Sequence, residues 1–243
     1  MDSLTIYVID AGNTHIKLGQ FINHELKKVH RFSSLEDIHT HLSEGDIVVL
    51  ANVGNLEIVL MLERLGCSIT NLSTKEKLPF TNAYKTPETL GIDRLCNIAA
   101  VQFLHPNKNV LVLDAGTCIK SDFIDCKGTY HGGSISPGIA MRYRSLHEYT
   151  ANLPLLHPTT YSILGSNTDE SIHSGVLGSV NTEVLWRIEK FNNRYEDILI
   201  YLTGGDAHYF DLGQKNSIFV DENLTLKGIY ALYLHQHSSD SLP

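Results

Sequence analysis

One octapeptide, Asp10-Ala11-Gly12-Asn13-Thr14-His15-Ile16-Lys17, recurs later in the chain as Asp114-Ala115-Gly116-Thr117-Cys118-Ile119-Lys120, one residue shorter. Each copy follows an apolar, largely β-branched run and is followed by a second strand-like run. The pattern therefore predicts two β-hairpins, each with an Asp and a Thr at its tip. The shared context on both sides favours an internal duplication. The predicted strand pairs are residues 4–9 with 16–21, and 110–113 with 121–124.

The segments between the two copies alternate strand, helix and strand, which indicates an α/β fold. The predicted elements are a strand at 47–51, an amphipathic helix at 56–65 closed by Gly66, and a strand at 68–72. A further helix is expected to begin after the turn at 87–91. Its apolar face should comprise Leu95, Ile98, Ala99 and Phe103.

Beyond the second copy, Gly132-Gly133 predicts a turn and Ser136-Pro137 predicts a helix start. We expect the polar tail, residues 238–243, to be disordered. The remaining predicted elements are a long helix at 169–192, a strand at 198–202 that runs into Thr203-Gly204-Gly205, and a final helix at 226–235. The chain thus divides into two halves of similar design, residues 1–108 and 109–243.

Composition excludes several classes of function. The 243 residues carry a formal net charge of -8, which argues against a general binder of nucleic acid or membranes. No apolar run approaches the ~20 residues that span a bilayer, and the N-terminus shows no signal-peptide pattern. The four cysteines form no C-x-x-C pair and lie in apolar contexts, as is typical of reduced thiols in a cytoplasmic protein. A small-molecule partner is therefore favoured.

The first turn holds groups that can bind a nucleotide phosphate and its metal ion. Backbone amides of a glycine turn, a Thr hydroxyl, an Asn amide and a Lys ammonium all contact phosphate, and a nearby carboxylate can hold a divalent ion. Residues 10–17 supply each of these groups. The stretch is neither a Walker A loop nor a dinucleotide fingerprint. Taken alone, an ordinary hairpin turn explains it better, because Asp, Gly and Asn are the usual turn residues.

The second turn favours the phosphate-binding interpretation over an ordinary hairpin turn. Two acidic glycine hairpins that face one another across a cleft would bind a nucleoside triphosphate from both sides. Thr203-Gly204-Gly205 adds a third glycine turn, where bare backbone can approach a base or ribose. Together the three turns are similar to the phosphate, phosphate and adenosine turns of the actin, hexokinase and Hsp70 superfamily. We therefore expect a duplicated actin-like ATPase (ribonuclease H-like) α/β fold, with two similar halves and a nucleotide cleft between them.

Gly91-Ile92-Asp93-Arg94 places a carboxylate and a guanidinium at a helix start. Phosphoryl transfer to an alcohol needs a base or orienting carboxylate and positive groups that spread the developing charge. Adjacent residues do not share a helix face, so Asp93 and Arg94 would reach different parts of a site. The helix dipole alone also favours an Asp in the first turn. The same ambiguity applies to Gly165-Ser166-Asn167-Thr168, where helix capping explains the residues.

An ordered set of motifs resembles type III pantothenate kinase over nearly the whole chain. Each motif is weak by itself, but their order and spacing are specific. The set comprises residues 10–17, Tyr84, GIDR (91–94), DAGT (114–117), GGSISPGI (132–139), NLP (152–154), GSNT (165–168) and TGG (203–205). The resemblance implies ATP-dependent phosphorylation of the primary hydroxyl of pantothenate to 4'-phosphopantothenate, the first step of coenzyme A biosynthesis.

The resemblance also implies roles for individual residues. Asp93 would be the catalytic proton acceptor, and Asp114 would hold a monovalent cation, K⁺ or NH₄⁺. Asp10 is assigned to Mg²⁺, because it lies at the first phosphate turn and Asp114 is already taken. The implied ATP contacts are Asp10, Ala11, Gly12, Asn13, Thr14, His15, Ile16, Lys17 and Thr117. The implied pantothenate contacts are Tyr84, Gly91, Ile92, Asp93, Arg94 and Thr168.

The second turn departs from the family pattern. Many relatives continue it with a Thr-rich string, whereas Cys118, Ile119 and Lys120 follow Thr117 here. This change removes a hydroxyl and places a positive charge nearby. The contacts to phosphate and to the monovalent cation are therefore open.

The resemblance implies a cytoplasmic homodimer whose site lies near the subunit interface, with pantothenate and ATP as partners and neither nucleic acid nor membrane. Two alternatives remain. One is a sugar or small-alcohol kinase of the same superfamily. The other is a non-catalytic actin-like switch or accessory protein that binds ATP, since fold alone does not fix function.

Overall fold

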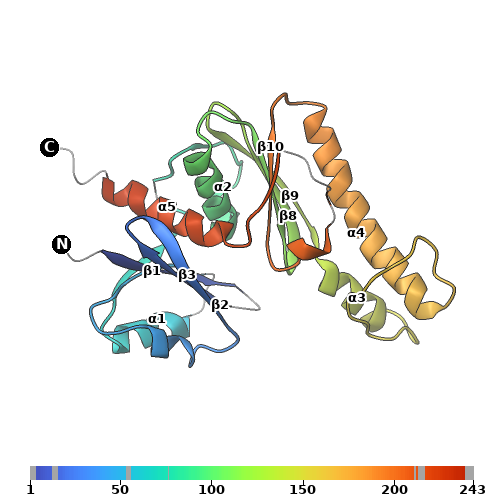
Figure 1. Cartoon of the computed structure of the whole chain (residues 1–243), viewed down its shortest axis with the longest axis horizontal. Helices are drawn as coiled ribbons and strands as arrows, with labels where there is room; N and C mark the ends of the chain where they lie inside the picture. Colours follow the sequence, from blue (N-terminus) through green and yellow to red (C-terminus); the bar gives the residue numbers. More distant parts are fainter. Residues whose placement is uncertain are drawn as a thin grey trace. The chain divides into compact units, whose positions relative to one another are not determined.

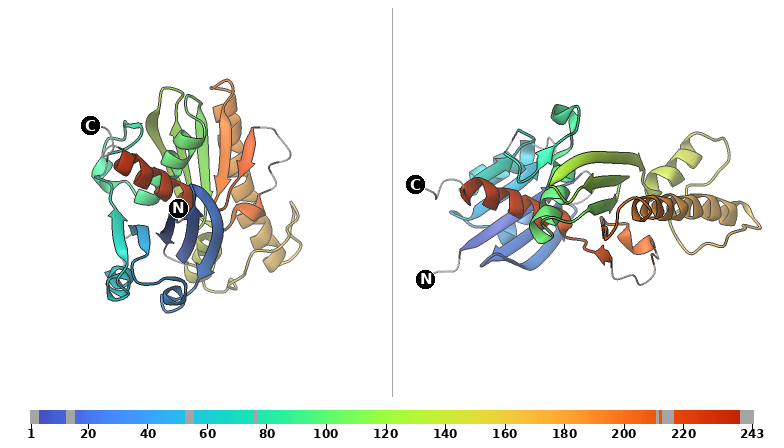
Figure 2. Two further views of the ribbon diagram at one scale, coloured as in Figure 1. Left: turned by 60° about the vertical axis from the view of Figure 1, so that its left-hand side comes forward. Right: turned by 90° about the horizontal axis from the view of Figure 1, so that it is seen from above.

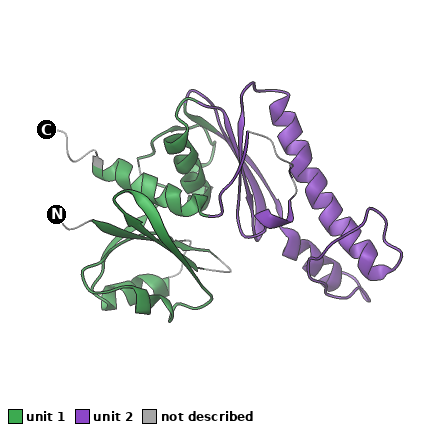
Figure 3. Cartoon of the chain, in the orientation of Figure 1, with its two compact units in different colours: residues 1–107, 128–130, 223–243 green, residues 108–127, 131–222 purple. Residues whose placement is uncertain are grey.

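The computed structural model describes residues 4–12, 16–52, 56–75, 77–210, 212 and 217–238. The chain forms two compact units, shown in Figure 3. Unit 1 comprises residues 1–107, 128–130 and 223–243, and unit 2 comprises residues 108–127 and 131–222. The C-terminal segment thus packs with unit 1. The predicted halves, 1–108 and 109–243, stay a prediction. They were defined by an internal sequence repeat, whereas the two units are defined by their compact packing.

Unit 1 is built on a five-stranded sheet in the order β3-β2-β1-β4-β5. Figure 1 labels β1, β2 and β3 of this sheet. β1 pairs antiparallel with β2 and parallel with β4, which confirms the first predicted hairpin. The edge strand β3 was not predicted, because its charged residues follow no apolar alternation and mark a solvent-facing edge. The strands are β1 (Thr5–Ala11), β2 (Ile16–Ile22), β3 (Glu25–Phe32), β4 (Ile47–Asn52) and β5 (Ser68–Leu72).

Helices cover both faces of this sheet. α1 (Leu56–Arg64) packs Ile58 and Leu62 into the core with Ile9 of β1. α2 (Ile92–Leu104) and α5 (Leu224–Ser238) lie on the opposite face, as Figures 1 and 2 show. A Cβ atom on Gly228 would lie 1.8 Å from the carbonyl oxygen of Cys96, so α5 and α2 cross with their backbones in contact. Only glycine permits this approach.

The predicted apolar face of α2 was correct except at its end. Leu95, Ile98 and Ala99 are buried, but the Phe103 side chain is 67% exposed. Burial continues along the helix only as far as Val101. The last turn of α2 therefore extends beyond the packed region, and Phe103 faces solvent there.

Unit 2 contains the strands β11-β10-β7-β8-β9 in that order. β7 and β8 form the second predicted hairpin, and β10 runs parallel to β7. The first two residues of β9 belong to unit 1 and pair there with the short strand β6 (Thr81–Asn82). The other strands are β7 (Val110–Ala115), β8 (Cys118–Ile124), β9 (Thr129–Pro137), β10 (Leu199–Thr203) and β11 (Ile218–Val220).

Two helices, α3 (Ile139–Glu148) and α4 (Thr168–Asn192), pack on one face of the unit 2 sheet. Their buried side chains, such as Tyr143 and Val180, meet Leu113 of β7 in one apolar cluster. The long helix predicted at 169–192 is confirmed. The final predicted helix is confirmed as well, although α5 is longer than expected and lies in unit 1.

Two predictions after the second hairpin were wrong. Gly132-Gly133 is no turn and Ser136-Pro137 begins no helix, because all four residues belong to β9. A Cβ atom on Gly133 would lie 1.6 Å from the carbonyl oxygen of Ser121. The lack of a side chain at Gly133 therefore allows β9 to lie close to β8 at this point. The helix begins instead at Ile139, after the N-cap Gly138.

The smaller features complete the fold. Short 3₁₀ helices occur at Ile38–His41, Pro87–Thr89 and Ala207–Tyr209. All four cysteines are free, but Cys126 is exposed rather than in an apolar context. Among the described residues no helix is both long and apolar enough to cross a membrane. Residues 239–243 of the predicted tail lie outside the described part of the chain.

Candidate active site

The first hairpin places Asp10 at the end of β1, directly opposite Lys17 of β2. The next pair toward the turn, Ala11 and Ile16, is buried, so these two residues could reach a ligand only through their backbones. Gly12 is exposed. Asn13, Thr14 and His15, which are predicted ATP contacts, lie outside the described residues.

Asp93 sits in the first turn of α2, where the helix dipole favours a carboxylate. Gly91 is the N-cap residue of this helix. A Cβ atom on Gly91 would lie 2.4 Å from Oδ1 of Asp93, so the carboxylate folds back over the start of the helix. A side chain at position 91 would displace the Asp93 carboxylate from this conformation.

The structure brings Asp10 and Asp93 close to one buried group, the thiol of Cys96 on α2. Cys96 is fully buried. Burial raises the pKa of the Cys96 thiol well above its ordinary value, and the nearby carboxylates of Asp10 and Asp93 raise it further. The carboxylate predicted to hold Mg²⁺ and the predicted catalytic base therefore both lie within electrostatic range of one thiol in unit 1.

Arg94 and Tyr84 stack beside this region. The Arg94 guanidinium carbon lies 5.5 Å from the centroid of the Tyr84 ring, which is cation–π geometry. Tyr84 in turn stacks on Tyr130 with 6.2 Å between ring centroids. Arg94 is only 4% exposed, and Ile92 faces the core. The GIDR segment thus supplies one carboxylate at the surface and one guanidinium held against an aromatic ring.

The second hairpin places Asp114 opposite Lys120. Their side chains form an ion pair, with 2.7 Å between Nζ of Lys120 and Oδ2 of Asp114. Both side chains are largely shielded, at 19% exposure for Lys120 and 15% for Asp114. Thr117, at the tip, is exposed. The sequence placed a lysine near this turn, but only the structure shows which carboxylate it contacts.

The backbones of two glycines pack directly against this second turn. A Cβ atom on Gly138 would lie 2.0 Å from the carbonyl oxygen of Gly116. A Cβ atom on Gly204, where φ is +94°, would lie 2.1 Å from the carbonyl oxygen of Ala115. The backbone amide of Asp206 also donates to Ala115. The predicted adenosine turn and the second phosphate turn are therefore adjacent in unit 2.

Asp206, which the sequence analysis did not single out, follows the Thr203-Gly204-Gly205 turn. Burial raises the pKa of its carboxyl group, and nearby His208 opposes part of that rise. A carboxylate after a strand-end glycine turn is common in sequences. No sequence signal distinguished it, because its position beside Ala115 depends on the pairing of β10 with β7.

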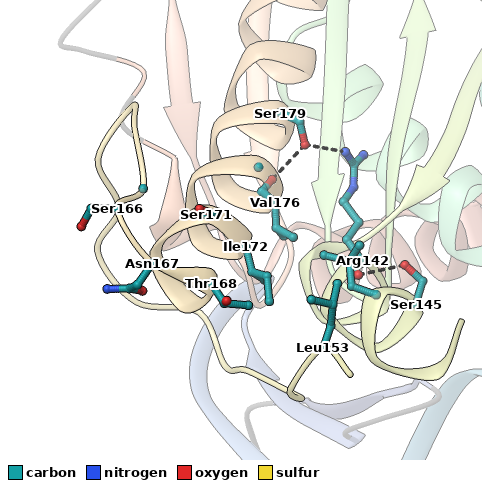
Figure 4. A pocket seen from close by; sticks show the side chains of 13 residues that line it. Arg142, Ser145, Leu153, Ser166, Asn167, Thr168, Ser171, Ile172, Val176 and Ser179 are labelled. Carbon is teal, nitrogen blue, oxygen red and sulfur yellow. Dashed lines mark hydrogen bonds between the residues drawn. The ribbon is translucent and has the colours of Figure 1, made fainter. Parts of the chain in front are cut away.

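Thr168 lines a pocket of about 750 Å³ in unit 2, shown in Figure 4. The pocket lies between α3, the start of α4 and the segment before it. The Arg142 guanidinium reaches in from α3 and donates to the Ser179 hydroxyl at 3.3 Å. It also pairs with Glu183 of α4. The other predicted pantothenate contacts lie in unit 1, so the structure does not bring Thr168 together with them inside one unit.

The helix-capping interpretation of GSNT is confirmed. The Asn167 side chain accepts a hydrogen bond from the backbone amide of Glu170 at 3.0 Å. The Glu170 carboxylate in turn accepts from the backbone amide and hydroxyl of Ser166, at 2.8 and 2.7 Å. This reciprocal arrangement resembles a capping box and fixes the N-terminus of α4.

Metal ligands are sparse in the part of the chain that the structure describes. No group of three or more His, Cys, Asp or Glu side chains there could hold a metal ion. Mg²⁺ commonly uses one or two carboxylates together with substrate phosphates. A single carboxylate such as Asp10 is compatible with that mode of binding.

Sequence comparisons identify relatives along nearly the whole chain. The profile of the family described as "Type III pantothenate kinase" matches residues 47–185. A type III pantothenate kinase from Flavobacterium psychrophilum is 40% identical over 242 residues, which cover 95% of this chain and 99% of that protein. Another from Phocaeicola vulgatus is 40% identical over 230 residues, covering 91% and 95% of the two chains.

Solved structures show the same fold at much lower identity. A Campylobacter jejuni protein described as a Baf family transcriptional activator has a TM-score of 0.64 at 20% identity, covering 96% of this chain and 99% of that one. A Listeria monocytogenes protein described as an N-acetylmannosamine kinase has a TM-score of 0.52 at 14% identity, covering 95% and 99%. The predicted α/β class and duplicated actin-like ATPase fold are confirmed. With two relatives at 40% identity over more than nine-tenths of its length, the chain belongs to the type III pantothenate kinase family.

Proposed function

We propose that this protein transfers the γ-phosphoryl group of ATP to the primary hydroxyl of pantothenate, giving 4'-phosphopantothenate and ADP in coenzyme A biosynthesis. The observation that carries the proposal is that the carboxylates of Asp10 and Asp93 both lie close enough to the buried Cys96 thiol to raise its pKa, in a chain 40% identical to type III pantothenate kinases. A kinase that phosphorylates an alcohol needs one carboxylate at the phosphate turn and another at the acceptor.

Asp93 acts as the proton acceptor. The hydroxyl oxygen of pantothenate attacks the γ-phosphorus, its proton passes to the Asp93 carboxylate, and the bond from the γ-phosphorus to the bridging oxygen of ADP breaks. Asp93 lies in the first turn of α2 and is folded over Gly91, which places the carboxylate at a helix N-terminus. Arg94, stacked on Tyr84, offers a guanidinium of the kind that binds a substrate carboxylate.

Each hairpin turn contacts phosphate. The first turn contributes the backbone from Asp10 to Ile16 and the Lys17 ammonium, and the second contributes the exposed Thr117 hydroxyl. Asp10 would hold Mg²⁺, which when bound neutralises charge on the phosphates. Because Ala11 and Ile16 are buried, their contribution is limited to backbone groups.

The second implied ion is a monovalent cation on Asp114, and there the residues do not fit. The Asp114 carboxylate already contacts the ammonium of Lys120. We therefore derive no step through K⁺ or NH₄⁺ at this position.

Pantothenate contacts come from Tyr84, Gly91, Ile92, Asp93, Arg94 and Thr168. Thr168 lines a pocket in unit 2, and a homodimer would offer a second copy of that pocket to each site. A homodimer would give a subunit interface to large apolar side chains of unit 2 that are exposed in the single chain. These side chains are Tyr149 (86% exposed), Ile163 (89%), Leu164 (81%) and Trp186 (52%). Sedimentation of the purified protein tests this point, and a monomer at assay concentration would contradict it.

The cytoplasm is the proposed compartment. The four cysteines are all free thiols, as is usual in that reducing environment. The two alternative functions are not favoured. The similarity to pantothenate kinases spans the GIDR segment and the second turn, which are the parts that would differ in a sugar kinase or in a non-catalytic switch.

The proposal is tested by ADP release from ATP and Mg²⁺ with a panel of acceptors that includes pantothenate, glycerol, glucose and N-acetylmannosamine. We expect turnover with pantothenate alone and a product with the mass of 4'-phosphopantothenate. Turnover with another acceptor would keep the kinase and exclude the substrate. Nucleotide binding with no turnover on any acceptor would favour the switch protein.

A further inference from the structure

We propose that the Lys120 ammonium is the resident monovalent cation of the second phosphate turn, so that this enzyme needs no K⁺ or NH₄⁺. The proposal rests on the kinase function above and concerns how the second turn obtains its positive charge. It starts from the ion pair between Lys120 and Asp114, in which Nζ lies 2.7 Å from Oδ2. That separation is typical of a strong, charge-assisted hydrogen bond.

The backbone fixes this pair. Asp114 and Lys120 are opposite residues in the antiparallel register of β7 and β8. Opposite residues in such a pair direct their side chains to the same face of the sheet at close range. The next pair, Ala115 and Ile119, is buried and closes the hairpin, which holds the register that places Lys120 opposite Asp114. The Lys120 ammonium is therefore positioned by the hairpin itself.

Three backbone carbonyl oxygen atoms of the turn also accept hydrogen bonds. The carbonyl oxygen of Ala115 accepts from the amide of Asp206 at 2.9 Å. Those of Thr117 and Cys118 each accept at 3.1 Å, from the amides of Gly138 and Gly116 respectively. A potassium ion replaces its hydration shell with several oxygen atoms of this kind. Here the carboxylate is paired and three carbonyl groups already accept an amide proton.

Charge leads to the same conclusion. Lys120 carries the one positive charge that a K⁺ ion would bring, and its ammonium presents N–H donors as NH₄⁺ would. A second cation on the Asp114 carboxylate would lie next to this ammonium, and like charges at that distance repel. The side chains of both partners are less than one-fifth exposed, so solvent would screen the repulsion only weakly.

The test compares the full-length protein with Lys120→Met and Lys120→Thr, and with Lys127→Met as a matched control. Lys127 is an exposed lysine in the same unit. Pantothenate-dependent ADP release is measured in K⁺, NH₄⁺ and N-methylglucamine at constant ionic strength. The melting temperature and the affinity for a non-hydrolysable ATP analogue with Mg²⁺ are measured in the same three cations.

We expect the rates of ADP release by wild type and Lys127→Met to differ by no more than about twofold among the three cations. A difference of that size is expected from small changes in electrostatic screening. Lys120→Met and Lys120→Thr should lose about 10- to 100-fold in activity in N-methylglucamine, as for loss of a hydrogen bond to a charged group. K⁺ or NH₄⁺ should restore much of that loss. The same ions should raise the melting temperature of these variants only.

Three results would overturn the proposal. One is activation of the wild type by K⁺ about tenfold or more, the size expected for a charge-assisted contact. Another is full activity of both Lys120 variants without K⁺ or NH₄⁺. The third is a folded but impaired Lys120 variant that neither ion restores. If no form turns over pantothenate, the proposed substrate is wrong, and the cation dependence of melting and of ATP-analogue binding still decides the role of Lys120.

Discussion

The hairpins of the two units share their register and differ in their surroundings. Asp10 lies opposite Lys17 and Asp114 lies opposite Lys120, each one pair below the pair that closes the turn. The first turn lies near a second carboxylate, that of Asp93. The second turn is closely approached by the backbones of two glycines, and its Asp114 carboxylate forms an ion pair with Lys120.

The helices associated with these hairpins also differ in the residues of their first turns. α2 and α3 both begin after a glycine N-cap, Gly91 and Gly138. The first turn of α2 carries Asp93, whereas the first turn of α3 carries no acidic residue. Gly138 instead lets its helix approach the carbonyl oxygen of Gly116. The comparison teaches that similar local patterns can be placed in different surroundings, and the proposed function assigns chemistry to unit 1 and phosphate support to unit 2.

Removing Asp93 should produce the largest effect, because it deletes the proposed proton acceptor, which has no counterpart in the first turn of α3. We expect Asp93→Asn to lower kcat by about 10²- to 10⁴-fold, the usual contribution of a general base. Calorimetry with an ATP analogue should show nearly unchanged binding. Glu88→Gln, an exposed carboxylate in the preceding 3₁₀ helix, is the control. Turnover of Asp93→Asn at the wild-type rate would remove the proposed division of tasks.

Adding a methyl group to the second turn tests its rigidity. Gly138→Ala should destabilise the protein by about 1 to 3 kcal/mol, because its Cβ would overlap a carbonyl oxygen that cannot move freely. Gly116→Ala, in the same turn, is the matched control, since a Cβ there meets no atom within 4 Å. Denaturant unfolding measures both. Equal stability of the two variants would show that the turn is not fastened by Gly138.

Lys17 and Lys120 test whether the two hairpins use equivalent lysines differently. We expect Lys17→Met to raise KM for ATP about 10- to 100-fold, as for loss of a charge-assisted contact to phosphate. Unlike the Lys120 variants, it should gain no activity from added K⁺. Lys28→Met, on the exposed edge strand β3, is the control. Rescue of Lys17→Met by K⁺ would mean that the two lysines do the same work.

The smallest expected effect concerns the acid stability of unit 2. Burial raises the pKa of Glu183, but hydrogen bonds from Ser136 and Arg142 outweigh it and leave the pKa lowered. A lowered pKa stabilises the folded state above the ordinary carboxyl value, and this stability is lost as pH falls through the folded-state pKa. Glu183→Gln should therefore flatten the decline of melting temperature in acid. Glu189→Gln on the same helix should leave it unchanged.

Patterns that act within a few neighbouring residues were predictable from the sequence. Both hairpins, the helix at α1 and the long α4 followed from apolar periodicity and cap residues, since these depend on local geometry. The order of the motifs from residues 10–17 to Thr203-Gly204-Gly205 also identified the family. The edge strand β3 escaped because its charged sequence lacks the alternation of a half-buried strand.

The parts that only the tertiary structure decided involve residues distant in sequence. Gly133 predicts a turn by itself, but in the fold it lets β9 approach the Ser121 carbonyl oxygen. Asp10 and Asp93, far apart in the sequence, come within electrostatic range of the same thiol, that of Cys96, only when α2 packs on the sheet.

The second turn shows both contributions at once. The sequence by itself determined that a hairpin would carry Asp114 and Lys120 near its tip, because alternation and turn residues act locally. Whether that lysine would face solvent, a phosphate or the carboxylate could not be read from its neighbours. The register of β7 and β8 and the shielding of both side chains decided for the carboxylate. Electrostatic partners depend on distance and burial, and only the folded chain sets these.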